Sequence, residues 1–465
     1  MVKKSQKPVT RRTTVGAVDP DVLAYTAGRD VVLDHALVEH DCMGTAAHVI
    51  MLSRMPVKPA LIGKAECAQI MAGLRRIIGL YRAGRFVITL EDQDVHLAVE
   101  RMLTKTLGAA GKKVHTGRSR NDQVALDLRL FARAQLLEAI SEIAALADTL
   151  LRFARAHRAV PMVGRTHMQP GMPSSVGVWA SAYAEELADG MELLWALYDL
   201  NNRSPLGAAA SYGVPLPIDR ALVARLLGFQ CAAHNVLYAN QGRGRLESIL
   251  LDGMSQVMLT LSRFAQDLML FTMPEFAYFT LPPAYCTGSS IMPQKRNPDV
   301  LELVRAKAAR VRAAAASVFE ISRGLPSGYN RDVQETKEPF MDGIATTRAS
   351  VRVLTGLSAG LGVNRAALRR GFTPDVFATD RALELVRAGT PFRDAYHHVK
   401  NHLDELAGVD PVAAIRQKVH EGAPYGLDFN RMRSRIQRPA RKAQTEKRRL
   451  AKISASLLSG ILPAK

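Results

Sequence analysis

The stretch RSRNDQVALDLRLFARAQLLEAISEIAALADTLLRFARAHRAV, residues 118–160, contains neither glycine nor proline over 43 residues. Its apolar side chains recur at steps of three and four, as in Leu126, Leu130 and Ala134, which is the spacing of one helix face. At about 1.5 Å per residue such a helix is up to roughly 60 Å long. The stretch therefore predicts a helix far longer than the globular average.

Three later runs have the same character. Residues 174–202 contain only two glycines, residues 245–273 only one, and residues 299–323 neither glycine nor proline. Parts of these runs, such as residues 249–270, are apolar on more than one face and must be covered on several sides. We therefore expect a mainly α fold with a central long-helix bundle, which other subunits extend into a multi-helix core.

Shorter segments, separated by turn signals, flank the long helices. The only convincing β-rich run is the short RFVITL, residues 85–90. After about residue 356, glycines and prolines divide the chain into short helices. We expect a three-domain subunit, with an N-terminal helical domain (1–118), the central bundle domain (119–365) and a C-terminal helical domain with a basic tail (366–465).

The charge of the chain is concentrated at its ends. The 62 Lys+Arg and 43 Asp+Glu give a formal net charge of +19, of which +14 falls within residues 1–14 and 431–452. A nucleic-acid-binding domain carries its basic residues on the folded body with interleaved aromatics, and aromatics here are only 6%. We therefore expect no nucleic-acid partner. With 48% apolar residues, the composition is also that of a globular rather than a disordered protein.

The sequence carries no signal for a membrane or secreted protein. No stretch of about 20 uncharged apolar residues is present, and residues 1–14 lack the apolar segment of a secretory signal. Four cysteines, Cys42, Cys67, Cys231 and Cys286, are far apart and show no metal-ligand spacing. We expect reduced thiols in a cytoplasmic protein without a membrane partner.

A polar segment, HTGRSRNDQ at residues 115–123, stands at the start of the longest predicted helix. Helix N-termini attract anions, and Arg118 and Arg120 add charge-assisted donors suited to carboxylates. Ser119 and Asn121 add neutral donors. A capped helix with solvated arginines remains the alternative interpretation.

Two further polar segments lie between helices. GRTHMQP, residues 164–170, places His167 between polar neighbours; this histidine is either a structural hydrogen bonder or a participant in chemistry. GLPSGYNRDVQETK, residues 324–337, is either a turn between helices or a lining of a cleft by its tyrosine, glutamine and lysine.

The segment TGSSIMPQKRNPD, residues 287–299, places a lysine and an asparagine six and eight residues after Ser289. A serine acts as a base only when its alkoxide is stabilised. Backbone N–H groups and a nearby ammonium such as that of Lys295 supply this stabilisation.

The Ser289 segment resembles the signature of the fumarase/aspartase superfamily, and residues 115–123 narrow the resemblance to the argininosuccinate lyase family. The similarity extends from about Asp30 to the 390s, through residues 92–96 and TPFR at residues 390–393. It implies a homotetramer of three-domain, mainly helical subunits. Each active site is then assembled from loops of three subunits.

The resemblance implies a carbon–nitrogen lyase that eliminates fumarate from an N-substituted aspartate, with argininosuccinate converted to arginine as the default reaction. Ser289 resembles the general base, and Lys295 and Asn297 would stabilise the intermediate. His167, paired with Glu302, would orient the substrate or assist proton transfer. No cofactor or metal is implied, because the amine is a tolerable leaving group once protonated.

Further positions match substrate-binding positions of the family. They are His96, Ser119, Arg120, Asn121, Thr166, Ser290, Met292, Asn297, Tyr329, Gln334 and Lys337. Together they indicate a small di- or polycarboxylate as the substrate.

The chain departs from the family pattern around the leaving-group half of the substrate. Arg165 replaces the usual tyrosine, Pro170 replaces a common arginine, and residues 240–245 replace a more acidic pattern. A guanidinium-bearing leaving group gains little from added arginine, whereas an anionic one gains. The rival substrate is another N-(1,2-dicarboxyethyl) amine, such as the aminopolycarboxylate ethylenediamine disuccinate.

The arginines expected to bear on function are Arg118, Arg120, Arg165 and Arg243. A catalytically silent structural protein, as crystallins of this family are, is a remote alternative. Retention of the serine, lysine, histidine and glutamate named above argues against it.

Overall fold

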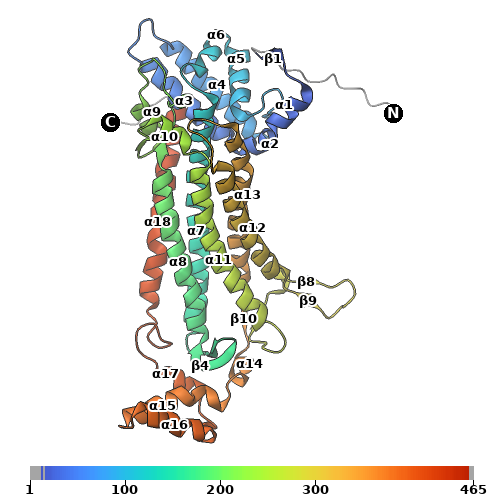
Figure 1. Cartoon of the computed structure of the whole chain (residues 1–465), viewed down its shortest axis with the longest axis vertical. Helices are drawn as coiled ribbons and strands as arrows, with labels where there is room; N and C mark the ends of the chain where they lie inside the picture. Colours follow the sequence, from blue (N-terminus) through green and yellow to red (C-terminus); the bar gives the residue numbers. More distant parts are fainter. Residues whose placement is uncertain (1–11, 14–15, 460–465) are drawn as a thin grey trace.

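The computed structural model describes residues 12–13 and 16–459 of the chain. Most of the basic segment at residues 1–14 therefore lies outside the described residues. Within them the chain forms a long rod of helices with a group of shorter helices at each end (Figure 1).

The axis of the rod is α7 (Arg120–Ala156), a single helix of 37 residues. The hydroxyl of Ser119 accepts a hydrogen bond from the Asn121 N–H at 3.2 Å, and the Asp122 carboxylate accepts one from the Ser119 N–H at 3.0 Å. This reciprocal pair is a capping box, which fixes where the helix begins. The long helix predicted from residues 118–160 is confirmed.

Four more long helices complete the centre of the bundle (Figure 1). They are α8 (Val176–Asn201), α11 (Arg245–Phe271), α12 (Asp299–Ser322) and α13 (Lys337–Ala359). Helices α8 and α13 pack on α7, and α11 packs on α8, α12 and α13. The predicted mainly α fold with a central long-helix bundle is confirmed.

The basic segment near the C-terminus, described from the sequence as a tail, instead forms α18 (Phe429–Ser459) beside α7 and α8. Met432, Ile436 and Ala443 on this helix are buried in the bundle, while most of its arginines and lysines face outward. The helix is amphipathic, so its charges were visible in the sequence composition while its apolar stripe was not recognised.

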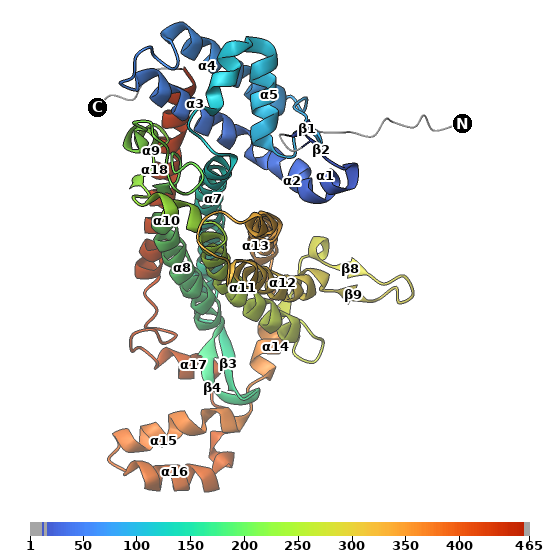
Figure 2. The same ribbon diagram turned by 45° about the horizontal axis from the view of Figure 1, so that its top comes forward.

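Short helices form the two ends of the rod. The N-terminal end contains α1 (Pro20–Ala27), α2 (Asp30–Leu33), η1 (Asp34–Leu37), α3 (Val38–Arg54), α4 (Lys64–Arg82), α5 (Val95–Leu107), α6 (Ala109–Lys112) and η2 (Lys113–His115), joined by α9 (Arg220–Leu226) and α10 (Val236–Gln241). The opposite end contains α14 (Arg365–Arg370), η5 (Pro374–Phe377), α15 (Ala378–Arg387), α16 (Phe392–Asn401), η6 (Leu403–Leu406) and α17 (Pro411–Arg416). Figure 2 shows the two groups separated by the length of the bundle.

The strands of the described residues all lie in two-stranded ribbons. The ribbons are β1 (Arg12–Thr13) with β2 (Gly16–Ala17), β3 (Pro161–Thr166) with β4 (Gln169–Ser175), β5 (Arg203–Ser204) with β6 (Cys231–Ala232), β7 (Phe279–Thr280) with β10 (Gly362–Val363), and β8 (Thr287–Gly288) with β9 (Arg296–Asn297). Three-residue helices η3 (Pro283–Tyr285) and η2, and the six-residue η4 (Arg331–Thr336), lie in the loops.

The strand expected at residues 85–90 is wrong, because this segment pairs with no neighbouring strand. Phe86 and Ile88 are buried while Val87 is 60% exposed. The alternation arises because an extended segment presses every second side chain into the helical core. A strand also needs a neighbour with which to form hydrogen bonds.

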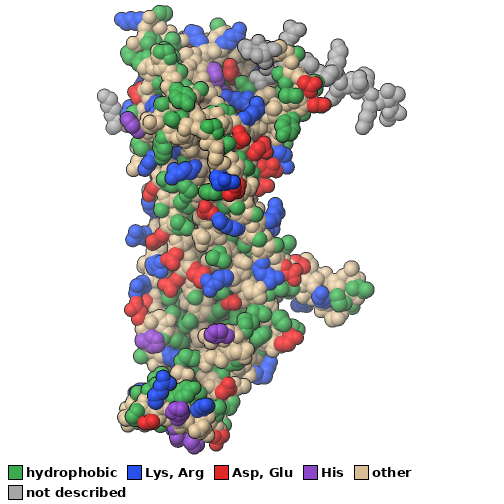
Figure 3. Space-filling view, in the orientation of Figure 1, with side chains coloured by type: hydrophobic (Ala, Val, Ile, Leu, Met, Phe, Trp, Pro, Cys, Tyr) green, Lys and Arg blue, Asp and Glu red, His purple; other side chains and the backbone are tan. Residues whose placement is uncertain are grey.

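The surface carries charges of both signs. On the face in Figure 3, Lys and Arg are interspersed with Asp and Glu along the bundle. Over the described residues, no helix has both the length and the apolar character that crossing a bilayer requires. The domain boundaries at residues 118 and 365 stay predictions.

Candidate active site

The predicted base, Ser289, lies on an arm that projects from the bundle between α11 and α12 (Figure 2). Its two strands, β8 and β9, pair antiparallel, with Thr287 opposite Asn297. The Thr287 hydroxyl is hydrogen-bonded to the carboxylate of Asp299 in the first turn of α12. The strand pairing and this bond tie the base of the arm to a long helix.

Backbone donors surround the Ser289 hydroxyl. Its oxygen accepts hydrogen bonds from the N–H of Ile291 at 3.3 Å and of Met292 at 3.0 Å. Such fixed donors favour negative charge on the oxygen that they face. The Asn297 amide lies 3.5 Å from the carbonyl oxygen of Gly288, across the arm.

The remaining predicted residues of this loop face outward. Ser290, Met292 and Lys295 are exposed. Glu302, in the first turn of α12, is also exposed. Nothing within the described part of this one chain encloses the arm as a binding cleft.

His167 lies at the tip of the ribbon formed by β3 and β4, at the far end of the bundle (Figure 1). Thr166 pairs with Gln169, and His167 and Met168 adopt φ values of 52° and 65°. Two successive positive φ values are the signature of a tight two-residue hairpin turn. The turn places the Thr166 and His167 side chains at an exposed tip.

This ribbon is not evident from the sequence, because Pro161, Pro170 and Pro173 argue against strands. Both strands of a two-stranded ribbon are edges, however, where a missing N–H is tolerated. Arg165 donates to the carbonyl oxygen of Met168 at 3.2 Å and lies 5.0 Å from the ring centre of Phe276. This arginine therefore stabilises the ribbon.

The start of α7 holds a third group of predicted residues at the N-terminal end of the rod. Arg120 forms an ion pair with Asp94 at 2.6 Å and donates to the Gln93 amide oxygen at 3.0 Å. Ser119 and Asn121 beside it are partly exposed. The two neutral donors therefore lie at a helix N-terminus that remains accessible.

His96 lies nearby but is buried. Its Nδ1 is 3.1 Å from Asp41 and its Nε2 is 3.0 Å from His115, and the side chain is 1% exposed. Neither spacing nor composition connects α3 with α5 and η2, so the sequence alone does not reveal Asp41 and His115 as partners of His96.

The loop that contains η4 places Tyr329, Gln334 and Lys337 near the same end. Tyr329 is 37% exposed, and the Gln334 amide donates to the carbonyl oxygen of Thr26 at 3.0 Å. Lys337 is 1% exposed and bonds Asp34 at 2.5 Å and Asp30 at 2.9 Å.

The charges around Lys337 shift its titration. Burial alone would lower the pKa of Lys337, but Asp34 and Asp30 outweigh burial and raise it. Burial raises the pKa of Asp30 to about 6, against the attraction of Lys337. The lysine therefore acts within this chain as the buried partner of two carboxylates.

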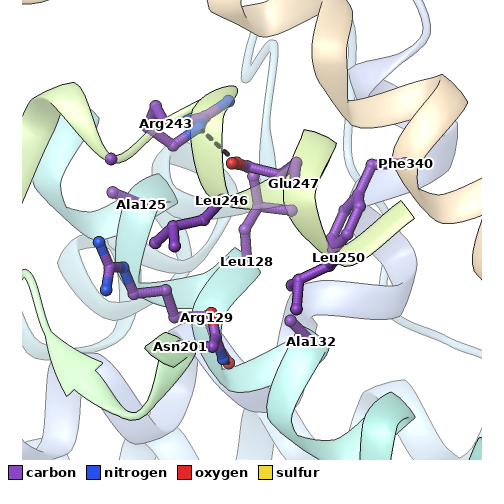
Figure 4. Close-up of a pocket in the computed structure, with 11 residues that line it drawn as sticks. Ala125, Leu128, Arg129, Ala132, Asn201, Arg243, Leu246, Glu247, Leu250 and Phe340 are labelled. Atoms are coloured by element: carbon purple, nitrogen blue, oxygen red, sulfur yellow. Dashed lines mark hydrogen bonds and ion pairs between the residues drawn. The ribbon is translucent and has the colours of Figure 1, made fainter. Parts of the chain in front are cut away.

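Two of the arginines expected to bear on function are instead structural. Figure 4 shows Arg243 directed toward Glu247 inside the bundle, at 3.2 Å, and Arg243 also donates to the carbonyl oxygen of Val333 at 2.9 Å. The surrounding pocket encloses about 10 Å³, room for roughly one water molecule. Arg118 is buried and donates to Gln123 at 2.7 Å and to Thr45 at 3.0 Å. Both guanidinium groups are therefore engaged in contacts within the chain.

His48 is buried beside Arg118, and its protonation reports on that burial. Burial lowers the pKa of His48 well below 6.5, and the Arg118 guanidinium adds to the shift. Its Nε2 donates to the carbonyl oxygen of Thr116 at 2.8 Å. Because only the unfolded chain takes up this proton, acid favours unfolding as the pH falls below 6.5.

We therefore expect His48→Gln, which keeps a donor, to flatten the acid dependence of stability. Between pH 6.5 and 5 the wild type should lose up to about 1.6 kcal/mol relative to the variant, because the slope rises from half to nearly all of about 1.4 kcal/mol per pH unit as the unfolded histidine becomes protonated. Urea unfolding at fixed protein concentration, followed by circular dichroism, measures the difference. Parallel stability curves for the two proteins would contradict the expectation.

Within one chain the predicted residues form three separate groups. One surrounds the start of α7 and η4, the second is the arm of β8 and β9, and the third is the tip of β3 and β4 (Figures 1 and 2). No contact joins Ser289, His167 and Glu302 among the residues that the structure describes.

Known proteins resemble this chain over most of its length. The model of a family described as lyase matches residues 31–313. Argininosuccinate lyase of Sorangium cellulosum is 45% identical over 426 residues, which cover 92% of this chain and 98% of the relative. Argininosuccinate lyase of Parabacteroides distasonis is 40% identical over 87% of this chain and 90% of the relative. The chain belongs to the argininosuccinate lyase family.

Its structure agrees with this assignment. EDDS lyase in complex with formate superposes with a TM-score of 0.77 over 94% of this chain and 93% of the other, at 22% identity. At this identity the likeness shows the fold alone. As a member of the family, the protein is a carbon–nitrogen lyase of the fumarase/aspartase superfamily. Enzymes of this superfamily act on small dicarboxylates and are oligomeric.

Proposed function

We propose that the protein converts argininosuccinate to arginine and fumarate. The observation that carries the proposal is the 45% identity to an argininosuccinate lyase across 98% of that relative's length. The aligned region spans nearly the whole length of that relative and includes the part of this chain that carries the predicted residues.

We propose that Ser289 removes the proton from the carbon next to a carboxylate of the substrate. The electron pair moves onto that carboxylate, which then carries two negative charges. It returns to form the double bond of fumarate as the C–N bond breaks, and the amine leaves with a proton. The two backbone N–H groups on the Ser289 oxygen support its role as the base.

In the same proposal, Lys295 and Asn297 stabilise the doubly charged intermediate, and His167 with Glu302 orients the substrate or assists proton transfer. Their side chains carry the charge or donors that this step needs. The residues proposed to bind the substrate are His96, Ser119, Arg120, Asn121, Thr166, Ser290, Met292, Asn297, Tyr329, Gln334 and Lys337.

We also propose that the enzyme is a homotetramer whose active sites each combine loops of three subunits. The separation of the three groups along one rod supports this arrangement. So do the exposed apolar side chains Leu259, Leu303 and Phe319 of the bundle, at 54%, 55% and 56%, because exposed apolar surface favours association.

Two more assignments accompany this proposal. The subunit is divided into domains at residues 118 and 365, and the enzyme works in the cytoplasm. The four cysteines support the second assignment, since all are free thiols and such thiols persist in reducing compartments.

The case for the rival substrate, ethylenediamine disuccinate, depends on the arginines added around the leaving-group half of the substrate. Of the added arginines, Arg243 is buried and bonded to Glu247, and Arg165 supports a ribbon. Both therefore serve contacts within the chain, and the default substrate is preferred.

The experiment incubates purified full-length protein separately with argininosuccinate and with ethylenediamine disuccinate, and follows fumarate. We expect fumarate from argininosuccinate, with arginine in equal amount. Turnover of ethylenediamine disuccinate alone would overturn the substrate assignment. Turnover of neither would favour the catalytically silent alternative.

A further inference from the structure

Two histidines and a glutamate meet where α5 packs against η2. His96 and Glu100 are four residues apart on α5 and therefore share a helix face, and His115 ends η2. Nε2 of His96 lies 3.0 Å from Nδ1 of His115, and Oε2 of Glu100 lies 3.7 Å from the same Nδ1. Atoms from all three residues lie within 4.8 Å of one another.

A buried carboxylate stands behind this group. Oδ2 of Asp41 lies 3.1 Å from Nδ1 of His96, and Asp41 is 0% exposed. Its other oxygen has no hydrogen-bond partner in the described structure. An Nδ1–H that donates to Asp41 leaves the lone pair of His96 Nε2 directed at His115. Carboxylates hold metal-binding histidines in this way.

The spacing of the ligand atoms suits a small divalent cation. Tetrahedral zinc with Zn–N distances of about 2.0–2.1 Å separates two ligand atoms by about 3.3 Å. The observed separations of 3.0 Å and 3.7 Å lie on either side of that value.

We propose that His96, His115 and Glu100 bind a zinc-type divalent cation, with water in the fourth position. The cation replaces the hydrogen that His115 Nδ1 shares with His96 Nε2. That proton leaves Nδ1 and a proton from solvent is taken up at Nε2 of His115, so the imidazole stays neutral and no net proton is released. His115 and Glu100 are 37% and 29% exposed, which gives the cation a path from solvent.

Binding of the cation also affects catalysis, and this step rests on the proposed function. His96 is proposed to bind the substrate, and His115 lies four residues before Ser119 in the same loop. A cation that occupies Nε2 of His96 removes this group from the substrate. We therefore expect micromolar-range zinc to slow fumarate release several-fold.

The test uses cobalt as a spectroscopic probe of the zinc site in the full-length protein. Four-coordinate cobalt absorbs visible light far more strongly than six-coordinate cobalt in water. We expect one equivalent of cobalt per chain to produce the strong band and zinc to abolish it. The variant Glu100→Gln, nearly identical in shape, should weaken cobalt binding at least about tenfold, and His115→Ala should remove the band.

The control is the double variant His398→Ala/His402→Ala. It removes the other group of potential ligands among the described residues, His398, His402 and Glu405, which are all exposed on α16 and η6. This variant should keep the band. A band that persists in both Glu100→Gln and His115→Ala, or that is lost in the control, would place the cation elsewhere and overturn the inference, as would the absence of a band in the wild type.

The two proposals fail separately. A cobalt band in a protein that releases no fumarate from any substrate would refute the proposed function and leave the cation site intact. Full activity without a cobalt band would refute the cation site and leave the proposed function intact. Far-ultraviolet circular dichroism of each variant shows whether a lost band reflects a lost ligand or a lost fold.

Discussion

Replacing Ser289 by alanine is expected to lower kcat for fumarate release by about 10²–10⁴-fold, the contribution of a positioned general base. The substitution removes one hydroxyl from a partly exposed arm, so the fold and the assembly should remain intact. Steady-state kinetics and the mass of the assembly in solution measure the two effects. The matched control is Ser434→Ala, on the exposed face of α18.

A near-normal rate for Ser289→Ala would mean that this serine is not the base, and the catalytic assignment would fail. A second measurement tests whether sites are shared. Subunits with Ser289→Ala, mixed and reassembled with subunits carrying His167→Ala, should regain part of the activity that each variant lacks alone. Some sites then combine an intact arm with an intact ribbon tip from different subunits. No recovery would indicate that both residues come from one subunit.

Replacing Lys337 by methionine is expected to destabilise the protein by about 3–5 kcal/mol, because Asp30 and Asp34 then remain buried without their cation. The methionine keeps most of the side-chain volume, so the lost charge dominates. Urea unfolding at fixed protein concentration measures the change. Lys400→Met, at an exposed position of α16, should change stability far less.

The matched rescue separates charge from packing. Adding Asp34→Asn to Lys337→Met removes the closer of the two uncompensated carboxylates and should recover part of the lost stability. If Lys337→Met unfolds at the same urea concentration as the wild type, the buried ion pairs contribute little. If the double variant is no more stable than the single one, the loss comes from packing.

The sequence determined the long helices of the fold because their signal is local. An uninterrupted run such as residues 118–160 repeats its apolar spacing over many turns, and no tertiary contact is needed to read it. Short ribbons give no such signal. Residues 161–175 were missed because prolines count against a strand unless the strand is known to be an edge. Residues 85–90 were expected to form a strand because they are rich in β-forming residues, but their apolar side chains pack on a helical core instead.

For the candidate active site, the sequence identified the loops but not the side chains that their residues contact. The polar segments around Ser289 and His167 were found from their composition and from the family they resemble. The pairs of Lys337 with Asp34, and of His96 with Asp41, join residues 303 and 55 positions apart, and no local pattern predicts such contacts. The burial of Arg118 and Arg243 likewise depends on tertiary packing, which no local pattern predicts. From their positions in the polar segments alone, both arginines were expected to be donors for a substrate.

The return of α18 along the rod has a consequence for biosynthesis. Near its end this helix packs against α3 and α4, and Arg75 of α4 donates to the carbonyl oxygen of Leu458 at 2.5 Å. The packing of α3 and α4 is therefore completed only after residue 458, more than 370 positions later, has been synthesised. The nascent chain must keep part of the apolar surface of α3 and α4 open until then, a condition under which larger proteins become prone to aggregation.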